Sequence, residues 1–250
     1  MKKTFKEFIR QKVVLFWTIG WPIIWVLIGS FSFTGDAPKE VVPFTRGSIT
    51  ISMMTVALMI AGMANLPGNI AEDRERGLLY KLMSMPVSPW KDFTGRFVAL
   101  FIFSIMALIL VFLVGFFCRA RFRPQANGVW IVVGMIMMSV FASAGVGMLV
   151  GSLIKNIHGA IMMGVGIAVV TAAISGIMAP YSVLPSILQK VSTGIPVSTA
   201  NSSLIYVLVG EELAGYNPLS MHQLVLGISV TIALFAAGLL LYSRYCWKKG

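Results

Sequence analysis

Long apolar stretches alternate with shorter polar segments along the whole chain. A helix needs about 20 mostly apolar residues to cross roughly 30 Å of hydrocarbon. Stretches of about this length without Asp, Glu, Lys, Arg or His lie at residues 13–33, 48–66, 97–117, 129–154, 159–178 and 224–242. The pattern predicts an all-α membrane protein with six transmembrane helices in one domain, residues 1–250.

The composition favours the same class. Of the 250 residues, 57% are hydrophobic and 12% are charged, and the mean hydropathy is +0.86. Ordinary soluble domains contain about 45–50% apolar residues, and a soluble fold of this size has too little interior for the surplus. The chain has only two cysteines, which are too few for a small scaffold held together by several disulfide bonds.

Lysine and arginine gather on one side of the predicted bundle. With six spans, both termini and the segments 67–96 and 155–158 share one side, which holds 14 of the 20 basic residues. Cytoplasmic loops carry such an excess, so we predict that both termini are cytoplasmic. The net charge of +11 is interpreted as an orientation signal and as contact with anionic membrane lipid, and not as nucleic-acid binding.

Two segments outside the predicted spans have unusual patterns. Residues 1–12 place Phe5, Phe8 and Ile9 at helical spacing, which favours a helix lying in the membrane interface; a charged, unstructured tail is the alternative. Residues 179–223 are too apolar and too rich in proline for a solvated loop. Non-helical backbone at membrane depth is stable only when it is buried in protein or lines water. A folded cap over the outer mouth and a loop on the headgroups remain the two interpretations.

A third segment, residues 67–96, combines a cluster of charges with an apolar stripe. Glu72 and Arg76 have the spacing of a helical ion pair, and Pro86 and Pro89 end the helix. We predict a short cytoplasmic helix that exposes both features and docks a soluble partner; a helix resting on the membrane is the alternative. The candidate docking residues are Glu72, Asp73, Arg74, Glu75, Arg76, Gly77, Leu78, Leu79 and Leu82.

This charged run, with Gly77 and the leucines before Pro86, resembles the cytoplasmic coupling loop of ABC type-2 exporter permeases. Residues 175–180 and 195–199 are similar to the extracellular re-entrant helices of that family. The resemblance implies an N-terminal interfacial helix, six spans, a cytoplasmic coupling helix after span two and a re-entrant extracellular segment before span six.

The resemblance also implies partners. It implies a multi-pass subunit in the plasma membrane that pairs with a second permease copy, identical or different, and docks two copies of an ATP-binding subunit. The chain contains no G-x-x-x-x-G-K-[ST] phosphate-binding motif. We therefore expect this chain to bind no cofactor and to catalyse no reaction, and the partner subunit to use ATP and Mg.

Small residues recur at every fourth position of the fifth predicted span. Such stripes let two helix backbones approach closely. The family arrangement implies that the stripe lies at the subunit interface or beside the substrate path; packing within the chain is the alternative. The methionines of span two suit varied apolar ligands or simply face lipid. The candidate path residues are Met59, Met63, Gly164, Ala168, Ala172 and Gly176.

The predicted spans contain no charged side chain that would pair with a small ion. We therefore predict outward movement of an apolar or amphipathic substrate, such as a drug, an antibiotic or a lipid-like molecule. A glycolipid or polysaccharide exporter is the closest alternative. An ion-independent secondary transporter and a membrane scaffold are more distant ones, since secondary transporters bury ionisable groups and a scaffold has no need of the coupling pattern.

Overall fold

The structure is a computed structural model that describes residues 12–32, 38–84, 88–124, 128–179 and 181–247. In these ranges the chain is helical and contains no strand, which confirms the all-α class. The interfacial helix predicted for residues 1–12 lies outside the described residues except for Lys12, and it stays a prediction.

Five of the described helices are long and apolar enough to cross a membrane. They are α4 continued through η2 and α5 (Val42–Ile60, Ala61–Asn65 and Leu66–Glu75), α7 (Pro89–Phe117), α8 (Gly128–Leu153), α9 (Ile157–Ile174) and α13 (Met221–Cys246). The first predicted span is also helical, as α2 (Lys12–Leu15), η1 (Phe16–Gly20) and α3 (Trp21–Ser32), but its apolar part is shorter. Five spans are thus supported by length and hydropathy, and the sixth stays a prediction.

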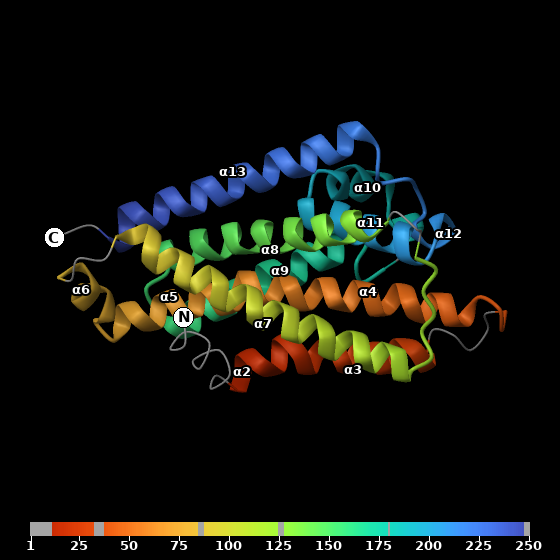
Figure 1. The fold of residues 1–250 in the computed structure, drawn as a ribbon, viewed down its shortest axis with the longest axis horizontal. Helices are drawn as coiled ribbons and strands as arrows, with labels where there is room; N and C mark the ends of the chain where they lie inside the picture. Colours follow the sequence, from red (N-terminus) through yellow and green to blue (C-terminus); the bar gives the residue numbers. More distant parts are fainter. Residues whose placement is uncertain (1–11, 33–37, 85–87, 125–127, 180, 248–250) are drawn as a thin grey trace.

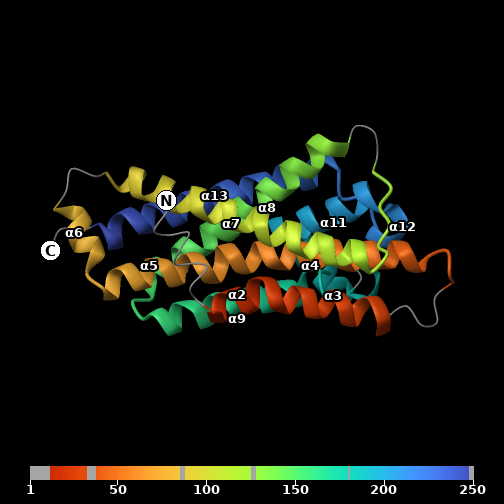
Figure 2. The same ribbon diagram turned by 60° about the horizontal axis from the view of Figure 1, so that its bottom comes forward.

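The long helices lie side by side along one axis, and short helices cover the two ends of the bundle (Figures 1 and 2). At one end, α6 (Leu78–Met83) lies close to the last turns of α13. At the other end lie η3 (Tyr181–Val183), α10 (Ser186–Thr193), α11 (Pro196–Leu208) and α12 (Glu211–Ala214). The apolar, proline-containing segment between α9 and α13 is thus folded into short helices, of which α11 is mostly buried.

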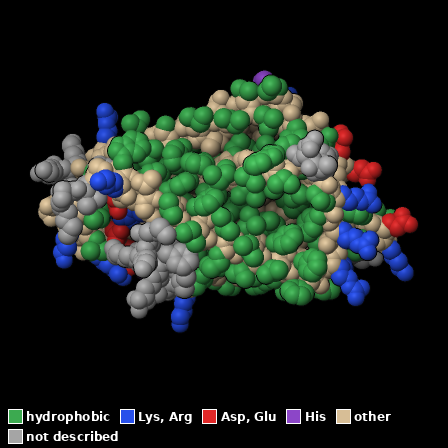
Figure 3. Space-filling model, viewed as in Figure 1, with side chains coloured by type: hydrophobic (Ala, Val, Ile, Leu, Met, Phe, Trp, Pro, Cys, Tyr) green, Lys and Arg blue, Asp and Glu red, His purple; other side chains and the backbone are tan. Residues whose placement is uncertain are grey.

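Hydrophobic side chains cover the middle of the bundle, and charged side chains gather at both ends (Figure 3). Many large apolar side chains are exposed, among them Phe31, Phe117, Val170 and Ile232. In water, a continuous apolar surface of this kind would promote aggregation, whereas in a bilayer it faces hydrocarbon. The surface agrees with a multi-pass membrane protein.

The central helix runs without a break from Val42 to Glu75, and 94% of its most apolar stretch is buried. The helix therefore continues past residue 66, where the predicted span two ends, and the limit of the span itself stays a prediction. Pro67 has no N–H to donate and normally breaks a helix. Here it follows the wider π-helical turn of η2, which changes the hydrogen-bond register, and the chain continues past the proline as α5.

The helix that contains the third predicted span, residues 97–117, begins ahead of that span, at Pro89. Ser88 is its N-cap, and the Ser88 Oγ accepts a hydrogen bond from the Lys91 N–H at 3.4 Å. Proline is well tolerated at the first helical position because the N–H there has no partner within the helix. Pro89 therefore starts α7 instead of only ending the helix before it.

The two π-helical turns meet inside the bundle. Asn65 of η2 donates from Nδ2 to the Oγ1 of Thr18 in η1 at 3.1 Å, and Thr18 donates to the Val14 carbonyl oxygen at 2.7 Å. Both side chains are fully buried. Polar side chains join membrane helices in this way, so the pair fixes the first helix against the central one.

Candidate functional site

A buried ionic cluster joins α5, α7 and α13 near the α6 end of the bundle. The Arg96 guanidinium lies 2.6 Å from the Asp73 carboxylate and 2.9 Å from the Asp92 carboxylate. Arg96 also donates to the Asn69 Oδ1 at 2.6 Å, and the Tyr242 hydroxyl donates to Asp92 at 2.5 Å. A buried charge is stable when it is paired and hydrogen-bonded, and these partners account for the burial of Arg96.

This cluster lies just outside the predicted spans, in the same helices, and the burial of its charged residues was not predicted. Asp73 and Arg96 are 4% and 2% exposed, and both lie in helices with the length and hydropathy of spans. The sequence interpretation placed them in a solvated loop because isolated charges are rare in membrane helices. The structure pairs them instead, and it adds Asn69, Asp92 and Tyr242, which the sequence interpretation did not single out.

The rest of the charged run bonds to the ends of neighbouring helices. Arg74 donates to the Ser152 carbonyl oxygen of α8 at 3.3 Å and to the Cys246 Sγ of α13 at 2.8 Å. The Glu75 carboxylate accepts from the Ile157 N–H at the start of α9 at 3.0 Å, where a negative charge is favourable. The end of α5 is thus bonded directly to α7, α8 and α9 and to α13.

Arg76 and Gly77 form the turn between α5 and α6, at the tip of the bundle (Figure 1). The predicted ion pair between Glu72 and Arg76 is present at 2.5 Å, and the Arg76 side chain is 61% exposed. Gly77 has a φ of +66°, a left-handed conformation that favours glycine and commonly ends a helix. The turn therefore depends on Gly77.

The apolar side of α6 faces the bundle. Leu79 is 2% exposed and belongs to the same apolar cluster as Phe93 and Leu100, against which Leu82 also packs; Leu78 is half-buried. The leucines of the predicted stripe are therefore not freely exposed, because their burial against α7 removes apolar surface from water. Among the side chains that the structure describes here, those of Glu75, Arg76, Lys81 and Ser84 are exposed.

The small-residue stripe of α9 packs inside the chain. A Cβ added at Gly164 would overlap the carbonyl oxygen of Met63, so the backbones of α9 and η2 are in close contact. Ala168, Ala172 and Met59 are buried in the same core. The structure favours packing within the chain for these residues and leaves none of them exposed to a second subunit.

A cavity of about 570 Å³ lies near the opposite end of the bundle, among α3, α4, α11 and α12, and we call it the outer cavity. Gly176, with a φ of +71°, borders it. Its volume and mixed wall are typical of sites for drug-sized molecules. The wall includes the apolar residues Trp25, Ile49, Met53, Ile177 and Ile205 and the polar residues Thr45, Ser48, Ser52, Tyr181, Asn201, Ser202 and Glu212.

The polar wall originates in a stripe of hydroxyl groups on α4. Thr45, Ser48, Ser52 and Thr55 recur at intervals of three or four residues, so they share one helix face. At the inner end of the stripe, Thr55 donates to the Asn201 Oδ1 of α11 at 3.0 Å, and the Asn201 Nδ2 lies 3.4 Å from the Ser52 Oγ. This spacing is the signal in the sequence that would have identified the cavity wall.

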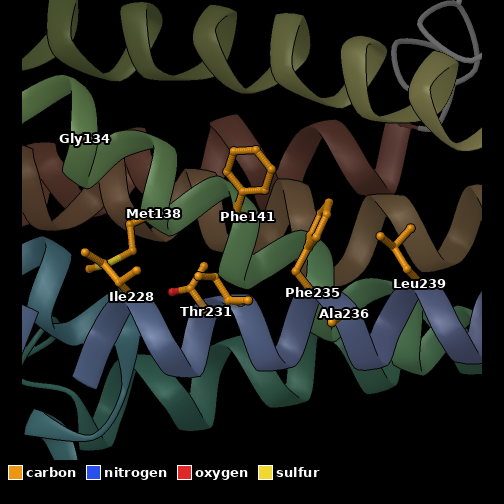
Figure 4. Close-up of a pocket in the computed structure, with 9 residues that line it drawn as sticks. Gly134, Met138, Phe141, Ile228, Thr231, Phe235, Ala236 and Leu239 are labelled. Atoms are coloured by element: carbon orange, nitrogen blue, oxygen red, sulfur yellow. The ribbon is translucent and has the colours of Figure 1, made fainter. Parts of the chain in front are cut away.

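A second hollow, of about 440 Å³, opens between α8 and α13 (Figure 4). Phe141 of α8 and Phe235 of α13 meet edge to face in it, with ring centroids 5.0 Å apart. Thr231 is the one polar residue among the nine that line it, and its hydroxyl donates to the Gly227 carbonyl oxygen at 2.7 Å. The hollow thus offers no free polar group to select a ligand.

Comparison with known families supports the sequence resemblance. The family described as ABC-2 type transporter matches residues 1–209, a range that contains the charged run, α6 and nearly all of the outer cavity wall. The comparison with curated proteins finds no match.

Proposed function

Because the chain belongs to the ABC-2 type transporter family and is a permease subunit of an ABC transporter, we propose that it exports an apolar or amphipathic substrate with a separate ATP-binding subunit. Permeases of this family are transport domains that generally work with such a subunit, which holds the ATPase activity. In this proposal, ATP and Mg are bound by the partner.

The turn between α5 and α6 is the observation that carries this proposal. Glu75, Arg76 and Lys81 are exposed there at the tip of the bundle. Directly behind them, Asp73 and Arg74 bond to α7, α8 and α13. A partner that pushes on this turn would therefore act on the ends of several long helices at once.

We further propose that this end is cytoplasmic and that the membrane is the plasma membrane. The excess of basic residues on the predicted cytoplasmic side supports this orientation. The complete exporter would contain two permease copies, as a homodimer, and two ATP-binding subunits. A second copy would bind a surface other than the buried face of α9.

The two hollows support the proposed substrate class. The outer cavity has a mixed wall, and the hollow between α8 and α13 is apolar. A path that includes both would suit a molecule with an apolar body and a small polar group. A small free ion would find few charged side chains along it.

Purification of the chain with its ATP-binding subunit, followed by reconstitution in nanodiscs, tests the proposal. We expect amphipathic compounds to stimulate ATP hydrolysis. Lys81→Glu should reduce that stimulation, because Lys81 lies at the proposed docking turn, whereas Lys39→Glu at the opposite end should not. Stimulation by small inorganic ions or free sugars alone would overturn the proposed substrate class.

A further inference from the structure

The outer cavity contains serine hydroxyls that donate no hydrogen bond to the described part of the protein, although the Ser52 Oγ accepts one from Asn201. Within the described part of the chain, the hydroxyls of Ser48, Ser52 and Ser202 donate no hydrogen bond. By contrast, Thr50 on the same helix donates to the carbonyl oxygen of Arg46 at 2.7 Å. A hydroxyl that is removed from water is more stable with a hydrogen-bond partner, and the three serines can donate to a ligand in the cavity.

These hydroxyls are not simply solvated surface groups. Ser52 and Ser202 are 6% and 5% exposed, although both line the cavity. They project from two different helices, α4 and α11, whose relative position is held by the bond between Thr55 and Asn201. The hydroxyl wall is therefore pre-formed.

One charged side chain lines the outer cavity. Glu212 of α12 is exposed, and it forms no ion pair with the residues that the structure describes. Trp25 and Tyr181 contribute aromatic rings to the same wall, and the face of an aromatic ring attracts cations. A carboxylate with two aromatic rings favours a positively charged group over a negative one.

Another part of the wall is apolar and includes Ile49, Met53, Ile177 and Ile205. A small inorganic cation would leave this surface in contact with water. A purely apolar molecule would accept no hydrogen bond from the serine hydroxyls and would offer no positive charge to Glu212. The ligand that satisfies both parts has an apolar body and a cationic group.

We propose that the outer cavity binds an amphipathic organic cation, with its charged group near Glu212 and its body against Trp25 and Ile205. The role of this cavity in transport rests on the proposed export function. In that function, a site at the α12 end of the bundle would hold the substrate before release. Binding itself requires neither ATP nor the partner subunit, so it is measurable on the purified chain alone.

Fluorescence anisotropy of rhodamine 6G, an amphipathic cation, with the purified chain in nanodiscs tests this site. We expect saturable binding above that of empty nanodiscs. Glu212→Gln should raise the Kd about threefold to tenfold, as expected for loss of a partly solvated charge pair. Glu211→Gln is the matched control, because Glu211 is adjacent in sequence but does not line the cavity, and it should leave the Kd unchanged.

A second pair of variants tests the hydroxyl wall. Ser52→Val should weaken rhodamine 6G binding, whereas Thr50→Val, on the same helix but outside the cavity, should not. Fluorescein, an anionic dye with a related ring system, should bind more weakly than rhodamine 6G. All variants should elute from size-exclusion chromatography as the wild-type protein does.

Three results would each overturn the inference: no saturable binding of rhodamine 6G, equal effects of the Glu211 and Glu212 variants, or tighter binding of fluorescein. A failure of the proposed function would give a different result. Rhodamine 6G would then bind as expected, but no ATP-binding subunit would associate with the chain or respond to the dye.

Discussion

Arg96 of α7 lies 2.6 Å from the carboxylate of Asp73 in α5, with the two side chains only 3% and 5% exposed. The pair joins two helices whose connecting segment contains the exposed turn at Arg76 and Gly77. The position of that turn is therefore held by a buried ionic contact and not only by apolar packing.

Removing one partner of this pair should destabilise the protein strongly. Arg96→Met removes the guanidinium that pairs with the carboxylates of Asp73 and Asp92, and breaking a buried pair typically lowers the free energy of unfolding by about 3–5 kcal/mol. Denaturant titration of the purified protein measures the change. Adding Asp73→Asn to Arg96→Met should recover part of the loss. Arg76→Gln, which removes a largely exposed partner, should change stability by about 1 kcal/mol or less; equal losses for Arg76 and Arg96 would contradict the account.

Two glycines of α9 should respond oppositely to alanine. Gly164→Ala places a methyl group against the Met63 carbonyl oxygen, and such overpacking lowers stability by about 1–3 kcal/mol. Gly166→Ala meets nothing within 4 Å and should leave stability unchanged or raise it, since alanine is the better helix former. Thermal unfolding of the two purified variants provides the comparison, and similar melting temperatures would show that α9 does not pack on η2 as described.

Gly77 should be required for its backbone conformation, and not because a larger side chain would clash with neighbouring atoms. Its φ is +66° and a Cβ there meets nothing within 4 Å, so Gly77→Ala introduces backbone strain of about 1–2 kcal/mol. We expect the alanine variant to shift the turn and to weaken stimulation of the partner's ATPase. Gly77→Asn should retain more activity, because asparagine enters the left-handed region more readily. The idea fails if the two variants lose equal activity.

The two ends of the bundle should lie on opposite sides of the membrane. In a Cys118→Ser/Cys246→Ser background, a cysteine at Glu211 should react with an impermeant maleimide on intact cells, and a cysteine at Lys81 only after permeabilisation. The native Cys246 is unsuitable as a probe because it is buried and accepts a hydrogen bond from Arg74. Labelling at Lys81 on intact cells would reverse the proposed orientation.

Hydropathy predicted the apolar part of each long helix but not its ends. A span was expected to stop where charges begin, and Glu72 and Asp73 therefore marked a loop. In the structure the helix continues through these residues, and Asp73 forms an ion pair with Arg96 on the next long helix. Pro67 does not end the helix either, and the π-helical turn that precedes it is not recognisable from residue types.

The candidate site was predicted only in part. The ion pair of Glu72 and Arg76 is local to one helix turn, and helical spacing was enough to predict it. The contact of Thr55 with Asn201 joins residues 146 positions apart, and nothing in the local sequence specifies which helices become neighbours. The spacing of the polar residues on α4 is present in the sequence. Whether these residues line a cavity depends on the position of α11, which the sequence does not specify.

We expect an ATP-binding subunit to dock at the turn between α5 and α6. A photo-crosslinking amino acid in place of Lys81 tests this docking directly. The crosslinker is activated in cells of the native host, and the linked protein is identified by mass spectrometry. The same substitution at Lys39 is the control. The account predicts a link from position 81, and not from position 39, to a protein with a G-x-x-x-x-G-K-[ST] motif. Absence of such a protein at position 81, or its equal capture at both positions, would contradict the account.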